Sequence, residues 1–433
     1  MKLFPYAHAT HPDWRIAVEL TLAQLRALMS NNDYCKTPQL GVLYITDHYA
    51  GQAAAILDTI SKELPTIENW TGTVGVGIAS NNVEYFDEPA LSVMLCELEQ
   101  NSFRVFNGIN PLSSAIKDKF NASCALIHAD GSTPDLGELI DELAQNTQSN
   151  YLFGGLTSSR SDLVQFSKSS AVSNKHLEGA FSTPVTSSLQ GGSGVFTGGM
   201  SGVAFDQSVK LISRVTQGCF PISKSRKITQ SDGHVILSLD GRAALDVLLE
   251  DLGLTMNAER TKLLKKVRET LVGLTGVTSD ALKKTGGLAD DVCVRHIIGL
   301  DTHRKGIAVA ELLTEDTQVT FCERNPLAAK SDLIRIATEI RESLEPLEMS
   351  AEQAEQASQI SLEDAPTLNR KIRGAIYISC AGRGGPHFGA PSAELQLIKK
   401  ALGDIPLTGF FAGGEIAHQN LYGYTGVLTV FTD

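Results

Sequence analysis

The chain has 433 residues, more than the roughly 250 to 300 at which a single hydrophobic core usually stops growing, so two domains are expected. Its composition, 42% hydrophobic and 20% charged, is typical of a folded globular protein. A formal net charge of -12 argues against a nucleic-acid-binding surface, and no apolar run reaches the roughly 20 residues of a membrane-spanning helix. We therefore expect neither nucleic-acid binding nor membrane insertion.

The amino terminus and the cysteines indicate a cytoplasmic location. Residues 1–6 lack the apolar segment and the cleavage site of a signal peptide. The seven cysteines are scattered, without the paired spacing of a zinc site or a disulfide framework. We expect reduced thiols, no metal and no cofactor.

The chain then shows one pattern three times, after an opening helix that Thr10 caps and that runs to about Met29. Each copy has an apolar strand, an amphipathic helix, a glycine-rich segment and a closing strand. The first copy covers Leu40–Asp47, 51–64, Gly72–Ser80 and Ala90–Leu98; the second covers Ser123–Asp130, 135–144, Tyr151–Arg160 and Gly202–Phe205; the third covers Gly374–Cys380, 392–402, Gly409–His418 and Gly426–Phe431.

A different pattern lies between the second and third copies. Asp232-Gly233 predicts a hairpin turn between two strands, and a helix that Gly253 ends follows it. We expect a helical segment over 258–284 and an antiparallel meander over 292–322. The predicted class is α/β, with two domains built from related strand-helix-strand units with mixed sheets.

The first strand of each copy ends in polar residues. A helix that joins two parallel strands places the loops at their carboxyl ends on one rim of the sheet, where ligands of open α/β sheets bind. These strands end at Asp47 and His48, at His128 and Asp130, and at Cys380 with Arg383 beyond it. We expect a ligand cleft along that rim.

The chain resembles the FIST family, a FIST N domain followed by a FIST C domain. The motifs that carry the resemblance are Trp14–Leu25, Ser123–Arg160, Gln217–Pro221, Leu239–Leu245, Cys322–Pro326, Ser379–Gly384 and Gly409–Ile416. It implies a FIST N-like domain over 1–217 and a FIST C-like domain over 218–433. It also implies a sensory module that binds amino acids or related small metabolites. Because the sequence shows no kinase, cyclase or chemotaxis module, the signalling partner is expected to be a separate protein.

Four residues of the third copy are the leading candidates for ligand binding. Arg383 has the planar guanidinium that clamps a carboxylate, and Glu415 has the charge that accepts an ammonium group. The alternative is an ion pair between the two. Gly413 and Gly414 allow backbone N–H groups to approach an anion, or else they allow close packing between copies.

Four further residues are weaker candidates. His128 and Asp130, like Asp47 and His48, are residue types that ligate metals, but capping and loop hydrogen bonds are their commoner roles. Arg324 and Asn325 follow a predicted strand, where ligand binding and a contact between domains are equally good interpretations.

Two alternatives to a sensor remain open. Cys380 precedes glycines at a strand end, as a nucleophile does, with His387 as its base, which would make an enzyme acting on a small amide or amino-acid-like substrate. The resemblance does not favour hydrolysis, and nucleotide-binding and G-x-S-x-G motifs are absent from the sequence. The second alternative is a protein-interaction scaffold.

Overall fold

The computed structural model describes residues 2–112, 120–169, 194–255, 259–276, 292–344 and 371–433. The predicted α/β class with mixed sheets is confirmed. Contacts divide the chain into two compact units: unit 1 comprises 1–214, 334–420 and 427–433, and unit 2 comprises 215–333 and 421–426. The boundary at 217/218 between the two family-like halves stays a prediction. No described helix is long and apolar enough to cross a membrane.

Unit 1 contains the three predicted copies, called repeats 1, 2 and 3 below, except for Gly426 of the third copy. Repeat 1 has strands β1 (Tyr6–Thr10), β2 (Leu40–Thr46), β3 (Asn69–Gly75), β4 (Gly77–Ser80), β5 (Val83–Phe86) and β6 (Ala90–Cys96). Repeat 2 has β7 (Phe103–Asn107), β8 (Cys124–Ala129), β9 (Tyr151–Leu156), β10 (Val164–Lys168), β11 (Val195–Thr197) and β12 (Met200–Phe205). Repeat 3 has β13 (Leu211–Thr216), β22 (Ile372–Cys380), β23 (Leu407–Ala412), β24 (Glu415–His418), β25 (Asn420–Tyr422) and β26 (Gly426–Thr432).

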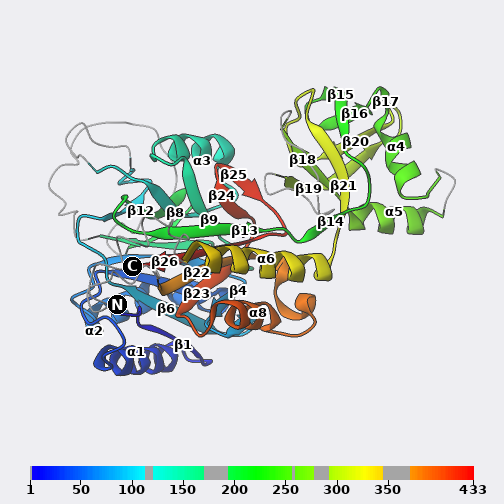
Figure 1. Ribbon diagram of the computed structural model, residues 1–433. Helices are drawn as coiled ribbons and strands as arrows, with labels where there is room; N and C mark the ends of the chain where they lie inside the picture. The colour runs from blue at the N-terminus through cyan, green and yellow to red at the C-terminus, as the bar shows by residue number, and fades with distance from the viewer. Residues whose placement is uncertain (1, 113–119, 170–193, 256–258, 277–291, 345–370) are drawn as a thin grey trace, which may run out of the picture. The chain divides into compact units, whose positions relative to one another are not determined.

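Each repeat joins two parallel strands through a helix, as predicted. The parallel pairs are β2 with β3, β8 with β9, and β22 with β23. The connecting helices are α2 (Ala53–Glu63), α3 (Leu136–Gln145) and α8 (Ala393–Leu402). Helices α1 (Trp14–Ser30), α3 and α8 lie at the periphery of unit 1 and the strands lie inside (Figure 1).

The repeats exchange strands in a cycle. The three sheets have the orders β1-β6-β2-β3-β10-β11, β25-β24-β9-β8-β12-β7 and β13-β26-β22-β23-β4-β5. The hairpin of repeat 2 therefore extends the sheet of repeat 1, that of repeat 3 extends the sheet of repeat 2, and that of repeat 1 extends the sheet of repeat 3. Because each sheet needs strands from two repeats, the three repeats form one core.

Helix α1 begins later than predicted. Thr10 ends β1, and its hydroxyl donates to the carbonyl of Pro89. The cap is Asp13, whose carboxylate accepts the N–H of Arg15 at 2.9 Å. The prediction that Thr10 caps this helix is wrong, because Thr10 continues the antiparallel pairing of β1 with β6. The apolar face of α1 packs with that of α2 in the hydrophobic core of the first sheet.

Unit 2 is largely antiparallel. Its strands are β14 (Cys219–Pro221), β15 (Arg226–Asp232), β16 (Val235–Leu239), β17 (Arg242–Ala243), β18 (Thr270–Thr275), β19 (Cys293–Asp301), β20 (Gly306–Val309) and β21 (Gln318–Arg324). Its helices are α4 (Ala244–Asp251) and α5 (Arg260–Glu269), and α6 (Pro326–Leu344) begins in it. The predicted hairpin around Gly233 is present. The predicted helix over 258–284 is wrong at residues 270–275, which form the buried strand β18 between β19 and β21, and its last part, 277–284, lies outside the described residues.

Candidate ligand-binding site

The segments that follow the parallel strands meet at the carboxyl rim of unit 1. Ser158, just beyond β9, accepts the N–H of Val76 at 3.0 Å and donates its hydroxyl to the carbonyl of Phe411 in β23. Ser158 therefore connects repeat 2 to both other repeats. The rim where the sequence predicts a ligand cleft is a packed junction at this point.

Arg383 is buried at this rim in an ion pair. It lies in the 3-10 turn Ala381–Arg383 after β22, and its side chain is 1% exposed. Its Nη2 and Nε donate to Oε1 of Glu394 in α8 at 2.5 and 2.9 Å. Glu394, 2% exposed, also accepts the hydroxyls of Tyr377 at 2.5 Å and Ser379 at 2.9 Å. Glu394 was not among the site residues predicted from the sequence.

Further carboxylates surround this pair. Burial alone would lower the pKa of Arg383, but the charges of Glu394 and Glu415 help to raise it above its ordinary value. Burial raises the pKa of Glu84 in β5, and Glu394 adds to that rise against hydrogen bonds from Ser392 and Gly385. The arrangement keeps Arg383 charged and fixes the loop after β22 to α8 and β5.

The other leading candidates lie near this cluster. Glu415 is fully buried in β24 opposite Gly155 of β9. Gly413 is exposed, and its N–H donates to the carbonyl of Leu156 at 3.0 Å. The carbonyl of Gly414 accepts the N–H of Leu156 at 2.8 Å. These two glycines thus pair with the end of β9.

His128 lies in the interior of unit 1. Its Nε2 is 3.2 Å from the hydroxyl of Tyr44, its ring packs against Phe410, and burial lowers its pKa to about 3. It contributes a neutral imidazole at the place where the three repeats meet. Asp130, also buried, accepts the N–H and hydroxyl of Ser132 at 2.8 and 2.7 Å, as a loop-capping carboxylate does.

The remaining sequence-selected residues fall into two groups. Arg324 and Asn325 lie in unit 2: the Arg324 guanidinium is 4.8 Å from the centre of the Tyr424 ring, and Asn325 accepts the N–H groups of Leu327 and Ala328 at the start of α6. Cys380 and His387 are half-buried, at the end of β22 and in the turn Gly385–Phe388.

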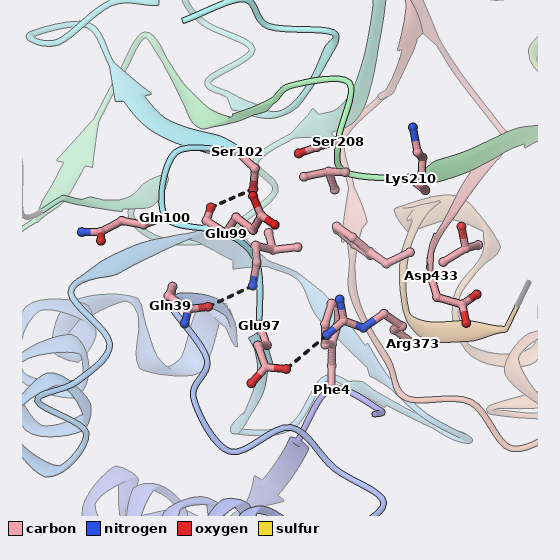
Figure 2. A pocket seen from close by; sticks show the side chains of 14 residues that line it. Phe4, Gln39, Glu97, Glu99, Gln100, Ser102, Ser208, Lys210, Arg373 and Asp433 are labelled. Carbon is pink, nitrogen blue, oxygen red and sulfur yellow. Dashed lines mark hydrogen bonds and ion pairs between the residues drawn. The ribbon is translucent and has the colours of Figure 1, made fainter. Parts of the chain in front are cut away.

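A cavity of about 480 Å³ lies at the opposite, amino-terminal rim of unit 1 (Figure 2). Gln39 and Arg373 come from the starts of β2 and β22, and Glu97 comes from the end of β6. Lys210 precedes β13, and Asp433 follows β26. None of the residues selected from the sequence lines it.

Arg373 is the best-placed charged group of this cavity. Its guanidinium lies 4.6 Å from the centre of the Phe4 ring, and its Nε donates to the carbonyl of Lys2 at 3.3 Å. Its Nη2 lies 3.5 Å from Oε2 of Glu97, a long contact between side chains that are 20% and 30% exposed. Glu97 and Arg373 point toward one another in Figure 2, and Lys210 and Asp433 belong to neighbouring segments of the lining.

Two further charges of the cavity, those of Lys210 and Asp433, are held by the backbone, and Glu99 adds a third carboxylate to the lining. The Lys210 ammonium donates to the carbonyl of Gln207 at 2.8 Å, and Asp433 accepts the N–H of Lys371 at 2.7 Å. Cations and carboxylates thus line one space, which suits a small molecule that carries both charges. The sequence offered one signal for this rim, namely the polar residues Gln39 and Arg373 at the starts of β2 and β22.

Comparison with known proteins agrees with the resemblance seen in the sequence. The FIST N domain model matches residues 39–242, and the FIST C domain model matches residues 244–418. The chain is 27% identical over 438 residues to the uncharacterized protein MT0656 of Mycobacterium tuberculosis, covering 98% of each chain. It is 26% identical to the uncharacterized protein Mb0898c of Mycobacterium bovis, covering 98% of this chain and 97% of that one.

Proposed function

The chain belongs to the FIST family, whose domains are sensory and signalling modules, and on this premise we propose that it senses an amino acid or a related zwitterion bound in the amino-rim cavity. The observation that carries this proposal is the lining, in which Arg373 and Lys210 share one space with Glu97 and Asp433. The volume of about 480 Å³ falls within the range of small-molecule sites.

Arg373 is suited to bind the carboxylate of such a ligand. The Phe4 ring already holds its guanidinium, so little side-chain freedom is lost on binding. Its contact with Glu97 is long and partly exposed, so a ligand carboxylate competes with it at small cost. Glu97 is then released toward the ligand ammonium. Lys210 supplies a second positive charge for an acidic side chain.

The carboxyl rim is a second candidate position for the ligand, with Arg383, Glu415, Gly413 and Gly414 as its binding groups. Gly413 is exposed there. Binding at Arg383, however, requires the pair with Glu394 to open, and breaking a buried ion pair costs about 3 to 5 kcal/mol. For this reason we favour the amino-rim cavity.

We further propose that the protein works in the cytoplasm and signals through a separate partner protein. Cys35, Cys96, Cys124, Cys219 and Cys322, all in described segments, are free thiols, as is usual in a reducing compartment.

Calorimetric titration with L-amino acids tests the proposed site. We expect saturable binding, accompanied by about 2.7 kcal/mol of added stability at a hundredfold excess over the dissociation constant. Arg373→Met should weaken the affinity roughly 10- to 100-fold, because a charge-assisted pair is lost. Arg15→Met is the matched control, since Arg15 lies 4.7 Å from the ring of Trp14 outside the cavity. Binding that both variants retain would place the ligand elsewhere.

A further inference from the structure

At each of the four positions where the chain passes between the two units, the described residues belong to regular secondary structure. The chain passes between the units at 214/215, 333/334, 420/421 and 426/427. These positions lie inside β13, α6, β25 and β26, respectively. Boundaries between compact units usually fall in flexible, polar linkers.

Two of these connections begin at the cavity. Lys210 lines the cavity and precedes β13, and Thr432 lines it and ends β26. The N–H of Thr432 donates to the carbonyl of Lys210 at 2.9 Å, and β13 and β26 are neighbours in their sheet. The far ends of both strands belong to unit 2, at residues 215–216 and 426.

Inside unit 2 the same two connections reach one hydrophobic cluster. Strand β14, which follows β13, contributes Cys219 to a cluster with Leu271, Val292, Val294 and Cys322, and Tyr424, just before β26, packs against it. The Arg324 guanidinium lies 4.8 Å from the centre of the Tyr424 ring, and the Tyr424 hydroxyl forms a hydrogen bond with Nε2 of His296. The pair β13 and β26 is therefore anchored in unit 2 and lines the cavity at its other end.

We propose that unit 2 is the output module of the sensor and that β13 and β26 transmit the occupancy of the cavity to it. This inference rests on the proposed function for the ligand, but the connection itself can be tested without one. A ligand that contacts Lys210 and the end of β26 biases the arrangement of these two strands. The segments of unit 2 that respond are 217–221 and 421–426.

The repeats supply a matched control. The Thr432 N–H to Lys210 carbonyl bond of repeat 3 has a counterpart in repeat 2, where the N–H of Asp206 donates to the carbonyl of Ser102, also at 2.9 Å. The strands that this second bond joins, β7 and β12, remain in unit 1. Proline removes the donor in either place.

Hydrogen exchange of the full-length protein measures the connection directly. In Thr432→Pro we expect exchange in 217–221 and 421–426 to become about tenfold faster, because loosening the cavity end of the pair weakens its anchor in unit 2. In Asp206→Pro the same segments should stay within about twofold of the wild type. Thr432→Gly, which keeps the N–H but loosens the backbone, should give a smaller change in the same direction if the proline variant does not fold.

The inference would be overturned if residues 217–221 and 421–426 exchanged at the wild-type rate in the Thr432 variants. It would also be overturned if their exchange rate rose equally in Asp206→Pro. Titration of the wild-type protein with L-amino acids reports the proposed function separately. If the wild type binds and the Thr432 variants leave exchange in unit 2 unchanged, only the output role is removed. If the Thr432 variants change exchange in unit 2 and the wild type binds no amino acid, only the ligand proposal is removed.

Discussion

Arg383 and Glu394 form an ion pair, 2.5 Å between Nη2 and Oε1, in which both side chains are at most 2% exposed. An exposed pair of nearly the same length, Arg26 with Glu63 at 2.6 Å, has side chains 55% and 49% exposed. The two pairs differ in burial and in hydrogen-bond partners, so the difference between their contributions to stability is measurable.

Glu394→Gln should lower the free energy of unfolding by about 3 to 5 kcal/mol, because it leaves the buried Arg383 guanidinium without its counter-charge. Glu63→Gln should change it by less than about 1 kcal/mol, since water screens an exposed pair. Urea denaturation of both variants checks this. Equal small losses would mean that the rim opens and admits water to Arg383, which would favour the rim as the ligand site.

Substitution by alanine should destabilise the protein far more at Gly409 than at Gly413. A β-carbon on Gly409 would lie 1.7 Å from the carbonyl oxygen of Tyr377 on the paired strand, whereas on Gly413 its nearest neighbour would be 3.5 Å away. Gly409→Ala should therefore cost about 3 kcal/mol or more by forcing β22 and β23 apart. Gly413→Ala should cost less than about 1 kcal/mol. Thermal unfolding of both variants tests this, and a tolerated Gly409→Ala would contradict the strand spacing.

His128 should make the protein less stable as the pH falls below about 6.5. Its pKa of about 3 in the folded protein lies below the ordinary value of 6.5, so the unfolded chain binds the proton more tightly. Between these values each pH unit should remove about 1.4 kcal/mol of unfolding free energy. Above pH 6.5, His128 does not change the pH dependence of the unfolding free energy. Between pH 5 and 6.5, the effect of His128 can be measured apart from the titration of carboxylates, which occurs at lower pH.

His128→Gln is the test of this pH dependence, since glutamine does not titrate and retains polar atoms near Tyr44. The difference in unfolding free energy between wild type and variant should narrow from pH 6.5 to pH 5. A difference that stays constant over this window would show that His128 does not carry the pH dependence.

Cys380→Ala separates a sensor from a thiol enzyme. We expect the variant to bind the ligand of the wild type within about twofold, and we expect the ligand to be recovered chemically unchanged from both proteins. Mass spectrometry of the incubated ligand and of amino-acid amides makes the measurement. Turnover by the wild type that disappears in Cys380→Ala would instead support the nucleophile alternative.

The repeats were predictable because their pattern is local. Apolar runs such as Leu40–Thr46 and Ile372–Cys380 identify strands by composition, and the helix that follows each run makes a parallel partner the natural expectation. The exchanged hairpins were not predictable. The side chains of β10 alternate in the same way whether the strand pairs with β9 of its own repeat or with β3 of another, so the pattern leaves its partner undetermined.

The site depended on tertiary structure for the same reason. Arg383 and Glu415 were recognised as unusual polar residues beside buried strands, but the partner of Arg383, Glu394, lies on a helix where an acidic residue is ordinary. Arg373 and Lys210 are far apart in the chain and meet only because β22 and β13 belong to one sheet. The sequence alone determined the parallel strands and connecting helices of the three repeats and the family resemblance, because those depend on neighbouring residues. Only the tertiary structure decided which charges share a cavity, because that depends on strand pairing between distant segments.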